Sequence, residues 1–281
     1  MGFRSRDATN LAISFATIAK RDAQASKTLY DMNLYANAVF SLQQAVEKDV
    51  KAVGILLGLV EPSFEDLARK VNHLSVLGLL VRLPKMLEEL PEVQESIKAE
   101  LDKPRVKETG LSQLLEPVIK PPKVNSETVR AAIKLIRAVD SDKAWKITLD
   151  LDPGNEFVRS IYKMLDVADA KWREANEAEH ITRRLHTLIL RRYGIATNQN
   201  SIGFFLNIAA RASQEAVPLA LLTMWHERRS RYPPIGTPDD WNVEAYTRQT
   251  GLIRGLPLFY RHLDRLVTST LSGARCARNL L

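Results

Sequence analysis

Apolar residues recur at intervals of three and four along the stretch from Leu34 to Leu57. This spacing places them on one side of an α-helix, so the stretch predicts an amphipathic helix whose apolar side faces a core. Gln43, Glu47 and Lys51 succeed one another at intervals of four and predict a polar stripe beside the apolar one. A solvated pair of Glu47 and Lys51 fits the same spacing. The apolar members are Tyr35, Val39, Leu42, Val46, Val50, Val53 and Leu57.

The same periodicity predicts helices before and after this stretch. A first helix begins near Asp7 and ends before a short break at residues 31–33, and the second helix closes near Gly58. A third helix runs from Phe64 towards Leu83, after which prolines divide residues 84–123 into a connector. The inward residues expected of the first helix are Leu11, Phe15, Ile18 and Ala19.

Turn signals divide the second half of the chain. Trp145 to Leu151 fits a short strand or an extended link, and the turn at residues 152–155 precedes a long helix from Glu156 to Tyr193. Prolines interrupt the later helices: the helix beginning at Ser201 is expected to break or kink at Pro218. The closing helical segment, from residue 241 onward, is expected to break near residue 257.

Composition favours an all-α globular protein. The 281 residues are 45% hydrophobic and 26% charged, enough for a sizeable core, and alternating strand patterns are scarce. The single cysteine, Cys276, forms no internal disulfide, and no cluster of cysteine and histidine predicts a metal site. No apolar run approaches the ~20 residues of a membrane span. The sequence therefore predicts a cytoplasmic protein without membrane segments, metal or cofactor.

The net charge of +7 favours a polyanionic partner such as nucleic acid, a ribonucleoprotein or an acidic protein. Basic residues gather at positions 183–184, 191–192 and 228–231. The last group includes Arg228, Arg229 and Arg231, with Trp225, His226 and Tyr232 beside it. Aromatic rings and guanidinium groups together can stack bases and hold phosphates, so this group is the first candidate for contact with RNA or a nucleotide. Basic residues at a helix C-terminus also arise simply because they oppose its dipole.

Two segments resemble a known family. The runs Tyr35–Phe40 (YANAVF) and Gln43–Lys48 (QQAVEK), with Lys51–Val53 and Gly58, are similar to the second helix of HEPN domains, the higher-eukaryote and prokaryote nucleotide-binding family. Glu227–Pro233 (ERRSRYP) is similar to the turn before the final helix in many HEPN domains. The resemblance implies an antiparallel helical bundle formed by residues 1–84 and 200–281, with a large helical insertion at residues 85–199.

The resemblance also implies a candidate chemistry. Ribonuclease members of the family pair an arginine with a histidine, with four to six residues between them, in the cleft of a dimer, and need no metal. Histidine can move the proton of a ribose 2′-hydroxyl while arginine holds the phosphate. Arg173 and His180, with six residues between them, fit this spacing, but three neighbouring glutamates would repel phosphate, and we favour a solvated helix as the explanation of the pair. His226 and Arg229 form a second candidate pair, in the reverse order. His262 shows no partner pattern and is expected to be a surface or packing residue.

These observations predict a HEPN-like protein that interacts with RNA and, as an enzyme, would be a metal-independent ribonuclease. The resemblance implies a homodimer in a defence, stress or toxin-antitoxin setting, with a cognate antitoxin or a nucleotidyltransferase-like protein as partner. One alternative is a non-catalytic protein that holds a nucleotide or phosphate with Gln43, Glu47 and Lys51 beside Arg229 and Arg231. The other is an adaptor that docks on a ribonucleoprotein or an acidic partner.

Overall fold

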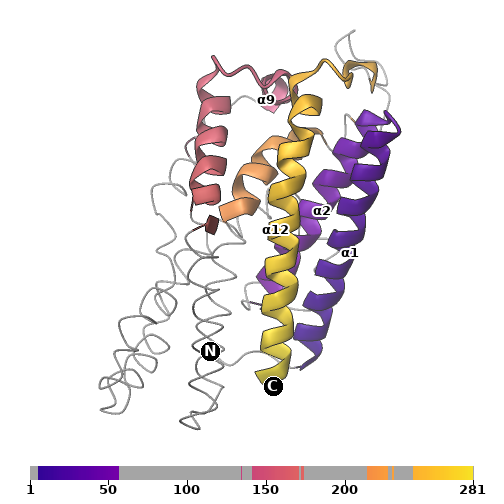
Figure 1. The fold of residues 1–281 in the computed structure, drawn as a ribbon, viewed down its shortest axis with the longest axis vertical. Helices are drawn as coiled ribbons and strands as arrows, with labels where there is room; N and C mark the ends of the chain where they lie inside the picture. The colour runs from indigo at the N-terminus through magenta and orange to yellow at the C-terminus, as the bar shows by residue number, and fades with distance from the viewer. Residues whose placement is uncertain are drawn as a thin grey trace, which may run out of the picture.

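The computed structural model describes residues 6–56, 134, 141–170, 172–173, 214–226, 230 and 243–280 (Figure 1). Residues 156–170, 172, 173 and 214–223 are helical, and no strand occurs among the described residues. The prediction of an all-α fold is confirmed, whereas the insertion and the domain boundaries stay predictions. The named elements are α1 (Arg6–Asp31), α2 (Tyr35–Leu56), α9 (Ser141–Asp150), α12 (Gly251–Leu280) and the 3₁₀ helices η1 (Met224–His226) and η2 (Val243–Ala245).

A tight turn joins α1 to α2 where the sequence predicts a break. Asn33 has a φ of 60°, a left-handed conformation that asparagine tolerates better than most residues. The amide of Leu34 donates to the carbonyl of Leu29 (2.8 Å), and the amide of Asn33 donates to the carbonyl of Tyr30 (3.0 Å). This pair of bonds is the Schellman arrangement, which satisfies the last carbonyls of a helix. The turn therefore sets α1 and α2 side by side.

Alanines form the buried face of α1. Four of them, spaced by three or four residues, are no more than 3% exposed, whereas the predicted inward residue Ile18 is 41% exposed. The expectation for Ile18 is wrong because the alanine stripe faces α2 and α12, whereas the predicted inward residues Leu11 and Phe15 are partly buried and packed against the core. Small side chains allow helices to approach one another closely. The four alanines are Ala12, Ala16, Ala19 and Ala23.

The predicted apolar face of α2 is confirmed. Its five central members, Val39, Leu42, Val46, Val50 and Val53, are all buried. Alanines on the other sides of the helix are buried too, so α2 is enclosed around most of its circumference. It packs against α1 and α12, which also contact each other, and it touches η1. α2 therefore contributes to the core on several of its sides.

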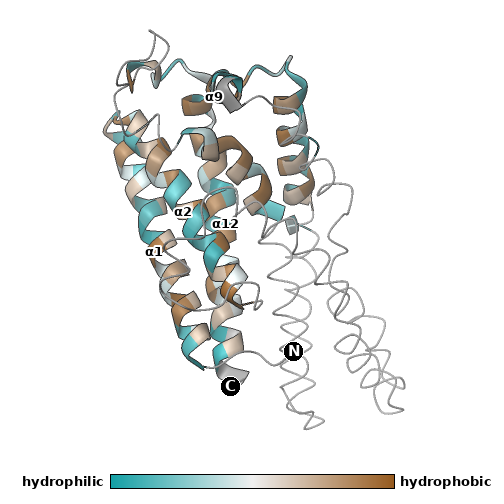
Figure 2. Ribbon diagram, turned by 180° about the vertical axis from the view of Figure 1, so that it is seen from behind, coloured by the Kyte–Doolittle hydropathy of each residue, from teal (hydrophilic) through white to brown (hydrophobic). Residues whose placement is uncertain are grey.

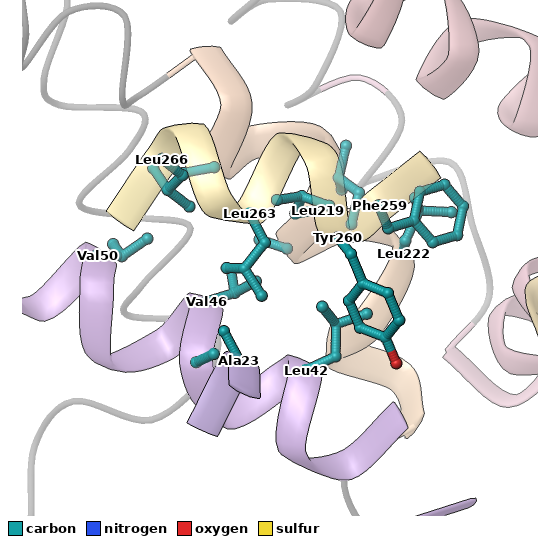
Figure 3. Packing of buried hydrophobic residues seen from close by; sticks show 14 of the residues in the cluster. Ala23, Leu42, Val46, Val50, Leu219, Leu222, Phe259, Tyr260, Leu263 and Leu266 are labelled. Atoms are coloured by element: carbon teal, nitrogen blue, oxygen red, sulfur yellow. The ribbon is translucent and has the colours of Figure 1, made fainter. Parts of the chain in front are cut away.

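Side chains from four helical segments meet in the core, with Ala23 coming from α1 (Figure 3). Leu42 of α2, Leu219 and Leu222 of the helical residues 214–223, and Phe259 and Leu263 of α12 are completely buried. Fully burying a side chain of this size contributes about 1.5–3 kcal/mol. Polar groups also link the helices: the hydroxyl of Tyr260 donates to the carbonyl of Ser26 (3.0 Å), and that of Ser26 donates to the carbonyl of Ala38 (2.7 Å). Burial raises the pKa of Tyr260 to about 12, although its bond to Ser26 opposes the rise.

The closing helix is continuous through its proline. α12 runs from Gly251 to Leu280 with Pro257 inside, so the predicted break is wrong. The proline is exposed and is the seventh residue of the helix, where its ring removes the donor for the carbonyl of Ile253. The buried residues after it hold the helix in place. Gly251 is required where α12 begins, because a Cβ there would lie 1.9 Å from the carbonyl oxygen of Asp150.

The stretch predicted as a strand or link is instead α9, Ser141–Asp150. Ala144, Trp145, Thr148 and Leu149 are buried, at the spacing of a helix. The predicted turn after it is confirmed by the bond from the amide of Asn155 to the carbonyl of Asp152 (3.0 Å). β-branched residues near the end of α9 suggested a strand, but the packing of one helical face decides the structure.

Other predicted features fall partly outside the described residues. The long helix expected to end at Tyr193 is described only as far as residue 173, and the helical residues 214–223 run through Pro218 without interruption. Figure 2 shows hydrophilic and hydrophobic residues alternating along α1 and α12, as expected of amphipathic helices. Across the described ranges, no helix is long and apolar enough to cross a membrane.

Candidate functional site

The polar stripe predicted on α2 is present. The side-chain amide of Gln43 donates to Glu47 (Nε2–Oε2, 3.2 Å), and the ammonium of Lys51 donates to the other oxygen of the same carboxylate (Nζ–Oε1, 2.5 Å). The side chains of Glu47 and Lys51 are only 13% and 12% exposed, so this is a largely buried pair and not the solvated pair that the spacing also allowed. The charge of Lys51 is balanced within the stripe. A role of these three residues in binding stays a prediction.

A buried carboxyl, that of Asp49, lies two residues from Glu47 and from Lys51 and therefore on the opposite side of the same helix. Asp49 is 0% exposed; its Oδ2 accepts a hydrogen bond from the hydroxyl of Thr270 (2.8 Å), and its Oδ1 has no hydrogen-bond partner among the described residues. Burial raises the pKa of Asp49 to about 7, although the bond from Thr270 opposes the rise. Asp49 was not among the candidate residues that the sequence indicated. Asp49 lies three residues after Val46, on the apolar side of the predicted helix, and this position could have indicated a buried carboxyl.

His226 is buried at the end of η1, between two hydroxyl groups. Its Nε2 lies 2.8 Å from Oγ1 of Thr148, and its Nδ1 lies 2.8 Å from the hydroxyl of Tyr246. The hydroxyl of Thr148 also donates to the carbonyls of Ala144 (2.9 Å) and Trp145 (3.1 Å), so its oxygen is left to accept from Nε2. In the neutral ring, Nδ1 then accepts from Tyr246. The arrangement fixes the ring orientation of His226.

The backbone of His226 also holds Ser230, four residues further along the chain. Its carbonyl accepts two hydrogen bonds from Ser230, one from the amide (2.9 Å) and one from the hydroxyl (2.7 Å). Ser230 is 6% exposed and is the serine between Arg229 and Arg231 in the sequence. Arg228, Arg229, Arg231 and Tyr232 lie outside the described residues. One position in the middle of the run is therefore fixed to the core.

The structure describes only one residue of the other predicted pair, Arg173 and His180. Arg173 is exposed, and its Nε donates to the carbonyl of Asp169 (3.4 Å) within the same helical segment. His180 lies outside the described residues. The structure therefore brings Gln43, Glu47 and Lys51 together, whereas the pairing of Arg173 with His180 and that of His226 with Arg229 stay predictions.

A second buried histidine lies in a charged cluster that the sequence did not predict. Nδ1 of His262 bonds Oε2 of Glu215, and both side chains are buried. Arg265 bonds Oδ1 of Asp169 and lies 3.5 Å from the other oxygen of Glu215. His262 was expected to be a surface or packing residue without a partner pattern. It is buried, but with a carboxylate partner from another helical segment.

The charged cluster also lowers the pKa of Asp169. Burial raises the pKa of Asp169, but the bond and charge of Arg265, with the charges of His262 and Arg261, outweigh it and hold this pKa below its ordinary value. Nη2 of Arg261 bonds Oδ2 of Asp169 at 3.1 Å. The ring of Trp172 lies 5.7 Å from the guanidinium carbon of Arg265, a cation–π distance. The cluster thus joins α12 to the helical residues 156–170, through Asp169, and to the helical residues 214–223, through Glu215.

No group of histidine, cysteine, aspartate and glutamate within the described ranges is arranged to hold a metal ion. Comparison with known proteins gives one finding: residues 14–139 match the family model described as HEPN domain. The matched region includes most of α1 and all of α2. Comparison with curated proteins and with solved structures gives no match. The match confirms the predicted resemblance to HEPN domains and includes the resembling segment in α2, whereas the segment at residues 227–233 lies outside it.

Proposed function

With residues 14–139 matching the HEPN domain, we propose that this protein binds RNA through the basic turn at residues 226–232. The match supports a function related to nucleotides or RNA. The proposal adds the location of the contact: Arg228, Arg229 and Arg231 contact phosphates, and Tyr232 stacks on a base.

The attachment of Ser230 to His226 carries this proposal. Two hydrogen bonds reach one carbonyl, and the ring of the same histidine is fixed by Thr148 and Tyr246. Arg229 and Arg231 each lie one peptide step from Ser230, about 3.8 Å between Cα atoms. Holding cationic groups near a rigid point lowers the entropy lost when they bind a phosphate chain. A basic segment anchored in this way is suited to binding.

In this proposal His226 is a positioning residue. A general base must reach the proton that it removes, and both ring nitrogens of His226 already face hydroxyl groups inside the protein. The geometry therefore supports binding more directly than cleavage by His226. Metal-independent ribonuclease activity stays a prediction, as do the catalytic assignments of Arg229, Arg173 and His180. The homodimer, the cytoplasmic location, the defence setting and a cognate antitoxin or nucleotidyltransferase-like partner also stay predictions.

Titration of a labelled RNA at several salt concentrations tests the proposal. The turn variant (Arg228→Gln, Arg229→Gln and Arg231→Gln) removes three cations, and we expect the slope of log affinity against log salt to become shallower by about 2, at about 0.7 per phosphate contact on a single strand. The lysine control (Lys134→Gln, Lys143→Gln and Lys146→Gln) removes the same charge at exposed positions elsewhere. An equal change in both variants would contradict a contact at the turn.

A separate incubation of RNA with the purified protein in excess chelator tests cleavage. A metal-independent nuclease would produce defined fragments, and substitution of its acid-base histidine would stop them. We expect His226→Gln to weaken RNA binding by loosening the turn. Fragments that disappear in this variant while RNA binding is unchanged would show that His226 is catalytic and that its positioning role is wrong.

A further inference from the structure

α12 differs from the other named helices in its charge. It contains five arginines and one aspartate, a net charge of +4 with histidine neutral. α1 contains four basic and three acidic residues, and α2 contains two of each. The single aspartate of α12, Asp264, is bonded to Lys27 of α1 (2.5 Å). Much of the excess positive charge of the chain is thus concentrated on one helix.

Three of these arginines form a line on the solvent face of α12. Arg254, Arg261 and Arg275 are exposed, and their positions differ by seven and by fourteen residues, so they share one side of the helix. At 1.5 Å per residue the line is roughly 30 Å long. Thr268 and Ser272, also exposed, lie between them. We call Arg254, Arg261 and Arg275 the α12 arginine ridge.

The ridge is only weakly balanced by acidic groups. Arg261 bonds Asp169, but that carboxylate is shared with Arg265, so it does not neutralise both. Arg254 and Arg275 have no ion pair among the described residues. In Figure 1 α12 passes in front of α2 and extends to the C-terminus. A long helix whose exposed side has this charge is complementary to an extended polyanion.

We propose that the α12 arginine ridge is a second contact for the phosphate backbone of RNA, an inference that rests on the proposed function. Guanidinium groups suit this contact because each presents several donors to phosphate oxygens, and the hydroxyls of Thr268 and Ser272 can add further bonds to the backbone. A contact of this kind carries no sequence preference. The ridge therefore adds affinity and salt dependence, whereas the basic turn at residues 226–232 also contacts bases.

The test compares full-length wild-type protein with the ridge variant (Arg254→Gln, Arg261→Gln and Arg275→Gln) and the lysine control, on unstructured RNAs of equal length and different sequence. We expect the ridge variant to make the salt slope shallower by about 2 with every RNA, at about 0.7 for each lost phosphate contact, and the lysine control to change it much less. Thermal unfolding of both variants, with Tm values near that of the wild type, shows that the fold is kept.

The two proposals fail in different ways. RNA binding by the wild type with the same salt slope in the ridge variant would overturn the ridge and leave the basic turn intact. Absence of RNA binding by the wild type would overturn the proposed function and the ridge with it. Binding of polyglutamate, but not RNA, that is lost in the ridge variant would assign the surface to an acidic protein and also overturn the proposal.

Discussion

Replacing Asp49 with asparagine should change how the stability of the protein depends on pH. Asp49 is completely buried, and within the part of the chain that the structure describes only one of its two oxygens has a hydrogen-bond partner, the hydroxyl of Thr270 on α12. The amide of asparagine keeps an oxygen that can accept from Thr270 but cannot ionise. The variant therefore resembles the protonated form of Asp49 at every pH.

The size of the change in unfolding free energy with pH depends on the pKa of the Asp49 carboxyl. Burial raises it from 3.8 to about 7, so the folded protein holds a proton that the unfolded chain releases between these values. Stability contributed by this group therefore falls as the pH rises from about 4 to 7 and changes little above that. The interval corresponds to about 4 kcal/mol, at about 1.4 kcal/mol per pKa unit.

Urea unfolding followed by circular dichroism, at several pH values from 4 to 8, measures this difference. We expect the free energy of unfolding of Asp49→Asn, relative to the wild type, to rise by up to about 4 kcal/mol across this range. Other titrating groups contribute equally to both proteins and cancel. Asp166→Asn, at an exposed position, is the control and should show no such trend. A constant difference between Asp49→Asn and the wild type from pH 4 to 8 would refute the reasoning.

Three further substitutions test the packing and the polar contacts. Tyr260→Phe removes the bond to the carbonyl of Ser26 and should lower the free energy of unfolding by about 1 kcal/mol; an unchanged Tm would contradict the bond. Glu215→Leu leaves His262 and Arg265 without a buried carboxylate and should cost about 3–5 kcal/mol by urea unfolding, whereas a loss below about 1 kcal/mol would mean that the cluster is not coupled. Gly251→Ala places a Cβ 1.9 Å from a carbonyl oxygen and should lower Tm more than Gly154→Ala, where the nearest atom is 3.1 Å away.

Features set by neighbouring residues could be predicted from the sequence. The apolar face of α2 and the polar stripe of Gln43, Glu47 and Lys51 each depend on spacing within a single helix. The break after Asp31 was predictable for the same reason, since Asn33 favours the left-handed conformation found there. Interactions at i and i+4 are local, so periodicity alone specifies them.

Features set by distant residues could not be predicted in this way. Glu215 and His262 lie 47 positions apart, and only the packing of their helices brings them together. The burial of Ala19 and the exposure of Ile18 likewise depend on which side of α1 meets α2 and α12. Pro257 is a case in which a local preference gave a wrong prediction. A proline inside a helix favours a break, but the packing of the residues after Pro257 keeps α12 continuous. Charge patterning found the basic turn but not the buried contacts that anchor it.

Mapping the crosslinks that ultraviolet light forms between RNA and the full-length protein tests the central claim most directly. We expect crosslinked peptides that include Trp225 to Tyr232, because aromatic rings stacked on bases react most readily, and we expect the turn variant to lose them. Crosslinks confined to other parts of the chain, and unchanged in the turn variant, would contradict RNA binding at the anchored basic turn.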